Sequence, residues 1–265
     1  MRYYVYNHHN FWQWGIPDSS LTESDIVFMW ADFPFRNEVK TLQAMGKKVI
    51  VYEHGFGALF DYELNNRDFI ADGYLALGDE SRDSLIRAGV DSNKILVTGN
   101  PIYDDIKKSK HTGNKALYVA LHWFRDVQEY NQIVFNQLRE AYPQFDWTVK
   151  LTDKTGDISA PKKWFNNVED NILEDIKEKL PKYDMVFTPN PSTFESFARL
   201  MGIPVYVVDE EETYKELGDP VRVPINNTYL KIGEKLLKQK PIDMDRYIKR
   251  PSLSLDIILD WTKTL

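Results

Sequence analysis

Lysine and hydroxyl side chains that could hold an anionic ligand stand where predicted strands end. Lys150 closes one such strand, and Ser192 and Thr193 open a predicted helix just after two prolines. A helix N-terminus offers free N–H groups and a positive dipole end, and a lysine adds a point charge. These residues predict a diphosphate site. The alternatives are a capping box of Ser192 with Glu195, needed only for folding, and a surface role for Lys150.

A histidine at a strand end is the first candidate for a general base. His54 follows the strand predicted over residues 48–52 and stands between a carboxylate and a glycine. Because the pKa of histidine lies near neutrality, its imidazole can take a proton from a hydroxyl group. Asp32, after the strand predicted over residues 25–30, is the second candidate. The alternative is a purely structural role for His54.

Two further loops at strand ends could reach the same ligand. Gly99 and Asn100 form one of them, where a glycine lets the backbone approach a ligand closely. His122 and Arg125 belong to the other. The alternatives are an ordinary turn for the first loop and, for the second, a loop whose aromatic residues pack in the core.

The composition excludes several kinds of site. The 265 residues include no cysteine, which excludes disulfide scaffolds, cysteine nucleophiles and cysteine-ligated metal sites. The usual glycine-rich nucleotide loops and the G-x-S-x-G elbow are absent, and the five histidines lack metal-ligand spacing. The net charge of −7 argues against a general nucleic-acid coat. No apolar run reaches the roughly 18 residues of a membrane helix and no secretory signal is present, so we expect a cytoplasmic protein.

The elements that must position these residues alternate along the chain. Short apolar runs predict strands, and they alternate with apolar residues at helical spacing, which is typical of α/β proteins with parallel sheets. Ligands of such sheets bind at the carboxyl ends of the strands. The expected strands are 3–6, 25–30, 48–52, 73–77, 95–98, 116–121, 147–151, 185–187 and 205–208, and the expected helices are 35–45, 79–88, 127–141, 172–180 and 193–201.

A polar stretch at residues 107–115 divides this series into two halves. We therefore expect two α/β domains, 1–110 and 111–265. Residues 255–265 are apolar on more than one face, which predicts a segment that is covered on several sides.

Together these loops resemble motifs of the two-domain glycosyltransferases of the GT-B fold. The resemblance is closest to CDP-glycerol glycerophosphotransferases and UDP-N-acetylglucosamine 2-epimerases. Residues 52–55 are similar to a strand-end His-Gly of the former, and residues 97–104 to the T-G-N-x-x-x-D segment of the latter. Residues 149–151 resemble a K-x-H-P strand end without its His-Pro, and residues 192–205 resemble the S-x-x-x-E-A…G-x-P donor helix and strand.

The resemblance implies two Rossmann-like domains and a C-terminal helix that returns to the first. The N-terminal domain would bind an acceptor, and the C-terminal domain a nucleotide-activated donor. We expect a glycosyltransferase that moves a sugar from a nucleoside diphosphate sugar, UDP-linked, to an acceptor hydroxyl. It would need no metal and no other cofactor.

In this scheme His54, or else Asp32, takes the proton of the acceptor hydroxyl. Lys150 with Ser192 and Thr193 neutralises the leaving diphosphate, where charge develops. The resemblance gives Glu195 the ribose hydroxyls. The other residues predicted to bind the donor are Gly99, Asn100, His122 and Arg125.

Two other functions stay open. One is a sugar-nucleotide 2-epimerase of the same fold, which needs no acceptor. The other is a module directed to nucleic acid, such as a phage-type DNA glucosyltransferase, or a non-catalytic binding module, for which the aromatic run at residues 11–14 could stack on bases. The acceptor is thus a glycan, a small molecule or a modified nucleic acid.

Overall fold

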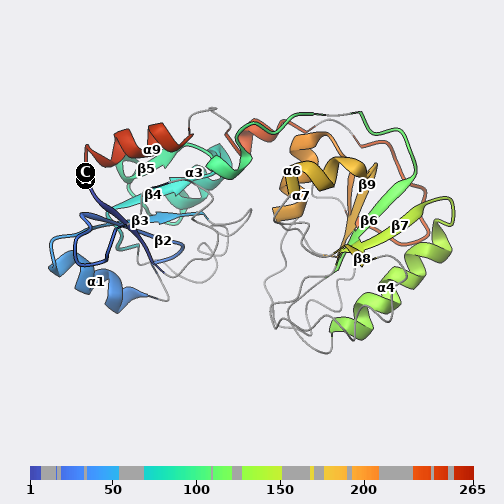
Figure 1. Ribbon diagram of the computed structural model, residues 1–265, viewed down its shortest axis with the longest axis horizontal. Helices are drawn as coiled ribbons and strands as arrows, with labels where there is room; N and C mark the ends of the chain where they lie inside the picture. The colour runs from blue at the N-terminus through green and yellow to red at the C-terminus, as the bar shows by residue number, and fades with distance from the viewer. Residues whose placement is uncertain are drawn as a thin grey trace. The chain divides into compact units, whose positions relative to one another are not determined.

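Two parallel sheets, each with its own helices, make up the computed structural model of the chain (Figure 1). The chain divides into two compact units: unit 1 is Met1–Asp105 with Asp243–Leu265, and unit 2 is Ile106–Ile242. The structure describes residues 1–6, 16, 19–32, 35–53, 69–108, 110–120, 127–150, 168–169, 176–189, 193–208, 229–239, 242–249 and 254–265.

The sheet of unit 1 places each strand beside the next one along the chain. Its described strands are β1 (Tyr3–Val5), β2 (Ile26–Met29), β3 (Lys48–Tyr52), β4 (Gly73–Ala76) and β5 (Ile95–Val97). All neighbouring pairs are parallel. Right-handed crossovers in a single direction place the connecting helices on one face of a sheet. Accordingly α1 (Arg36–Ala44) and α3 (Asp79–Arg87) contribute to the same core, through Val39, Leu42 and Leu85.

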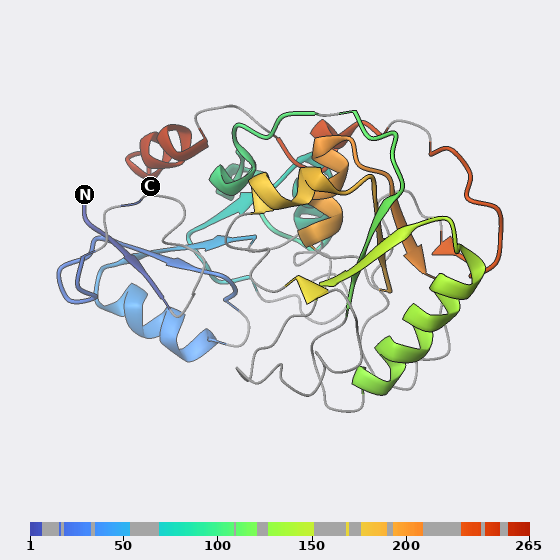
Figure 2. The ribbon, with the colours of Figure 1, turned by 45° about the vertical axis from the view of Figure 1, so that its right-hand side comes forward.

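The opposite face of this sheet is covered by the C-terminal helix α9 (Ser254–Thr262). Ile258 of α9 is fully buried in a second core with Phe28 and Ile50. Figures 1 and 2 show α1 and α9 on opposite sides of the sheet. The return of the C-terminal helix to the first domain, which the resemblance implied, is confirmed. Ile257 is 39% exposed, so α9 is not covered on every side.

The sheet of unit 2 changes direction in its middle. The described strands are β6 (Lys115–Val119), β7 (Asp146–Lys150), β8 (Val168–Glu169), β9 (Met185–Thr188), β10 (Val205–Val208) and β11 (Tyr229–Leu230). They are parallel and lie in the order β11-β10-β9-β6-β7-β8. The chain moves outward from β6 to β8 and returns to the other side of β6 as β9. Such a reversal is a topological switch point, where open α/β sheets bind their ligands.

Helices lie on both sides of this second sheet (Figures 1 and 2). On one face α4 (Val127–Ala141) packs Val134 and Leu138 against Trp147 and Val149 of β7. On the other side lies α7 (Thr193–Met201), whose bounds are those predicted from the sequence. The predicted α/β fold with two parallel sheets is confirmed. Within the described residues, no helix is long and apolar enough to cross a membrane.

Candidate functional site

Lys150 is a buried amine at the carboxyl end of the second sheet. It is the last residue of β7, next to the central strand β6, and only 4% of its surface is exposed. Trp147 and Val149 face α4, so the alternation of a strand directs Lys150 to the opposite face. There its Nζ lies 4.5 Å from the ring centroid of Phe194, in the first turn of α7.

The surroundings of Lys150 disfavour a positive charge. No hydrogen-bond acceptor and no carboxylate partner of its Nζ is found in the part of the chain that the structure describes. Burial lowers the pKa of Lys150 from 10.5 to about 7. The nearby N-terminal turn of α7 contributes the positive end of a helix dipole. A bound anion would compensate both charges, so the arrangement suits a phosphate group.

Thr193 is the first residue of α7, as the sequence predicted. Ser192, His122 and Arg125 lie outside the described residues, and so does His54. Their predicted roles stay predictions. Within the described ranges, no group of three or more histidine and acidic side chains could hold a metal ion.

Glu195 is held in a buried ion pair on α7. Its Oε1 accepts a 2.7 Å hydrogen bond from Nε of Arg199, one turn later, and Glu195 is fully buried. Arg199 also donates to Gln239, whose side chain accepts from the backbone N–H of Val205 and donates to its carbonyl. This network ties α7 to the start of β10. The ribose contact that the resemblance implies for Glu195 stays a prediction.

Arg199 and Gln239 were not predicted from the sequence. The signal for Arg199 was available, because a glutamate and an arginine four residues apart on a helix are neighbours. Gln239 left no local signal, since its partners are distant in sequence.

Gly99 and Asn100 lie in unit 1, where they contact the chain's own backbone. Gly99 has φ of +75°, and a Cβ there would lie 1.8 Å from the carbonyl oxygen of Lys249. The Asn100 side chain accepts a 3.0 Å hydrogen bond from the backbone N–H of Ile102, as a local cap. Both residues therefore have structural roles, and their predicted contact with the donor stays a prediction.

The C-terminal segment 243–249 packs at the carboxyl ends of β4 and β5. The N–H of Lys249 donates to the carbonyl of Leu77 at 2.7 Å. Asp104, the last residue of the T-G-N-x-x-x-D segment, accepts hydrogen bonds from the backbone N–H and the Oγ of Ser254, which starts α9. This motif therefore anchors the returning chain in unit 1.

Asp32 follows β2 and is 1% exposed. Its Oδ2 accepts a 2.6 Å hydrogen bond from the hydroxyl of Tyr74 and weaker ones from the N–H groups of Ile70 and Ala71. Its Oδ1 is buried without a hydrogen-bond partner among the described residues. The carboxylate fixes the turn before β4, and its role as a base stays a prediction.

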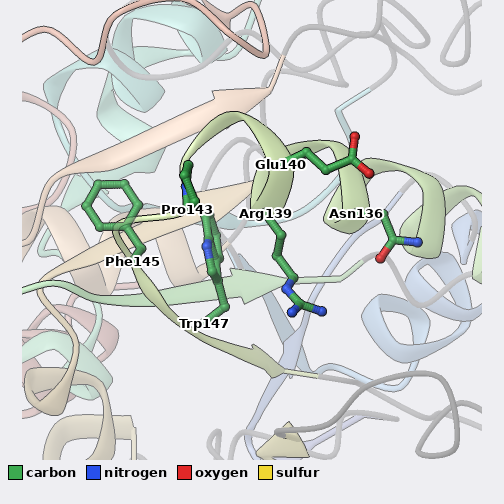
Figure 3. Close-up of a pocket in the computed structure, with 6 residues that line it drawn as sticks. All are labelled: Asn136, Arg139, Glu140, Pro143, Phe145 and Trp147. Carbon is green, nitrogen blue, oxygen red and sulfur yellow. The ribbon is translucent and has the colours of Figure 1, made fainter.

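A hollow of about 390 Å³ lies elsewhere in unit 2, between the last turns of α4 and the start of β7 (Figure 3). Pro143, Phe145 and Trp147 contribute its apolar part, and Asn136, Arg139 and Glu140 its polar part. Because it adjoins the amino end of β7, it is separate from the edge at which parallel sheets bind ligands.

Comparison with known proteins supports the fold. No protein-family model and no curated protein matches the sequence. Among solved structures, S. aureus MnaA with UDP is similar at 14% identity, over 96% of this chain and 84% of that one, with a TM-score of 0.59. The UDP-GlcNAc 2-epimerase from Neisseria meningitidis bound to UDP-GlcNAc is 14% identical, over 96% of this chain and 88% of that one, with a TM-score of 0.56.

The wall teichoic acid polymerase TagF is also similar, at 12% identity over 94% of this chain and 78% of that one, with a TM-score of 0.53. Identities this low show the fold and nothing finer. The switch point in unit 2 and the C-terminal helix returning to unit 1 agree with it. The chain therefore has the GT-B fold, with two Rossmann-like domains.

Proposed function

We propose that this protein is a glycosyltransferase that uses a nucleoside diphosphate sugar. The observation that carries the proposal is the buried Lys150 beside the first turn of α7, at the carboxyl end of the second sheet. An anion binds there with two positive partners, the ammonium and the helix dipole. Two of the similar structures contain UDP or UDP-GlcNAc, so UDP is the first nucleotide to test.

The chemistry follows from where charge develops. The acceptor oxygen forms a bond to the anomeric carbon as the bond from that carbon to the diphosphate breaks. The leaving diphosphate gains negative charge, which Lys150 and the N–H groups of α7 stabilise. The acceptor hydroxyl loses its proton to a base of unit 1, His54 or Asp32.

Replacing Lys150 by methionine tests the donor site. Methionine keeps the length of the side chain and removes the amine. A hydrogen bond to a charged group contributes about 1.5–3 kcal/mol, so the Kd for UDP should rise about 10- to 100-fold by calorimetry. Lys115→Met is the matched control, since Lys115 is an exposed lysine at the amino end of β6. Equal UDP affinity in both variants would show that Lys150 does not contact the diphosphate.

A 2-epimerase is the second candidate. It is favoured by residues 97–104, which resemble the epimerase segment, and by the UDP-GlcNAc 2-epimerases among the similar structures. The two reactions differ in their need for an acceptor. Incubation with UDP-N-acetylglucosamine alone should leave the sugar configuration unchanged if the protein is a transferase. Conversion to the N-acetylmannosamine form would establish the epimerase instead.

A further inference from the structure

Among the residues that the structure describes, no carboxylate pairs with the Lys150 amine. The amine is almost wholly buried and lies against an aromatic ring and a helix N-terminus. Its contact with Phe194 is a cation–π interaction, which offsets part of the lost hydration of an ammonium. Burial outweighs this contact, so the free site favours a neutral amine, whereas a site that holds a phosphate favours the charged form.

The charged side chains that the structure describes on the neighbouring helix neutralise each other. On α7 they are Glu195 and Arg199, which pair with each other at 2.7 Å. On β8, the backbone of Glu169 is in register with Lys150. Strand β6 ends beside Lys150 in Val119, and Ala120 follows it; both residues are apolar. Burial alone accounts for the lowered pKa, which is about 7.

We propose that binding of the donor's diphosphate places a proton on Lys150. At pH 8 the amine is mostly neutral in the free protein and an ammonium in the complex, where its new N–H group donates to a phosphate oxygen. The proton comes from the solvent and returns to it when the nucleoside diphosphate leaves. This inference rests on the proposed function, because it concerns the same site.

If UDP binding takes up a proton, the affinity for UDP depends on pH in a defined direction. Below about pH 7 the free protein already carries the proton, and binding takes up none. Above that pH each complex needs a proton from solution, so affinity falls as the pH rises. Between pH 7.5 and 8.5 the Kd for UDP should rise about eightfold. UDP itself is fully ionised in this range, because the second pKa of a phosphate group is about 6.

Calorimetry measures this proton directly. UDP is titrated into the full-length protein at pH 8 in buffers of different ionisation enthalpy, and the slope of the binding enthalpy gives the number of protons taken up. We expect about 0.9 proton per UDP bound. Lys150→Met should bind UDP more weakly, with almost no uptake. Lys150→Arg, which stays charged, should bind with no uptake and with a pH-independent Kd.

The outcomes separate the two proposals. UDP binding without proton uptake would overturn the inference and leave the proposed function standing. Uptake that persists in Lys150→Met would assign the proton to another group and overturn it too. Failure of the nucleoside diphosphates of all the common bases to bind would overturn the proposed function and this inference together. Nitrogen NMR of the Lys150 amine in the free protein, which should titrate near pH 7, gives the same answer without a ligand.

Discussion

Glu195 has two competing roles that one substitution separates. Glu195→Gln keeps the shape of the side chain and removes its charge. If the ion pair with Arg199 is its only role, the free energy of unfolding should fall by about 3–5 kcal/mol, because a buried arginine loses its partner. UDP affinity of the folded variant should then match the wild type. Urea unfolding and calorimetry measure the two quantities.

The ribose role makes the opposite prediction. Glu195→Gln would then bind UDP at least tenfold more weakly, and the loss would be smaller for a nucleotide that lacks the 2′-hydroxyl. Ser192 and Thr193 are not altered, so the diphosphate contacts proposed for them stay the same in this comparison. A variant with wild-type stability and reduced UDP affinity would overturn the structural assignment of Glu195.

The sequence predicted on which strand or helix a functional side chain lies, but not its burial or its partners. The strand predicted over residues 147–151 follows from its apolar residues, and the structure gives it as β7, Asp146–Lys150. The burial of the amine was not predictable, because it depends on Phe194, a residue distant in sequence. Similarly, the ion pair of Glu195 with Arg199 was not predicted, and the capping box of Glu195 with Ser192 stays a prediction because Ser192 lies outside the described residues.

The turn after β5 illustrates how an element can be held by the chain's own terminus. Gly99→Ala should displace the segment around Lys249, because the added Cβ would collide with the backbone carbonyl. Gly46→Ala is the matched control: Gly46 has nearly the same φ, +78°, and no atom within 4 Å of an added Cβ. The control should cost about 1–2 kcal/mol of stability, from left-handed strain alone, and Gly99→Ala more.

The same pair tests whether Gly99 serves a ligand. Its structural role predicts reduced stability of Gly99→Ala with unchanged UDP affinity in the folded protein. The two variants could instead have equal unfolding midpoints, with UDP binding lost only in Gly99→Ala. That result would show that Gly99 contacts the donor. Thermal unfolding with and without UDP measures both effects.

Elements with strong periodicity were predicted well, and their ends less so. The apolar spacing after residue 192 gave the bounds of α7, which has a fully buried face. The helix predicted over residues 79–88 exists as α3, which ends one residue earlier, at Arg87. For the helix predicted over residues 172–180, the described part is Ile176–Lys179, followed by a 3-10 turn that contains Pro181. Proline lacks the N–H that would continue an α-helix, and this accounts for the change.

At the scale of the molecule, the alternation of strands and helices predicted the α/β fold. The apolar C-terminal residues predicted a segment that is covered on several sides. Residues 255–265 have apolar side chains on several faces, of which Ile258 enters the core of unit 1. The order of the strands could not be read from the sequence, because parallel pairing joins distant segments. That order places the switch point in unit 2, where we propose the donor site.

The proposed transferase has its base in unit 1 and its donor-binding residues in unit 2. Loss of the base should therefore leave the affinity for the donor unchanged. We predict that His54→Asn lowers turnover at least a hundredfold and leaves UDP affinity near wild type, since a positioned base contributes about 10²- to 10⁴-fold. His111→Asn, in the polar stretch between the halves, is the control for loss of a histidine and should keep full activity.

Asp32→Asn completes this test, although it will also weaken the hydrogen bonds to Tyr74 and the following turn, so its stability must be measured alongside. If His54→Asn is fully active and folded Asp32→Asn is inactive, Asp32 is the base, and the acceptor binds beside the end of β2. If both variants keep wild-type turnover, the proposed acceptor side is wrong. Steady-state kinetics at saturating donor distinguish these outcomes, because only the step that removes the acceptor proton should change.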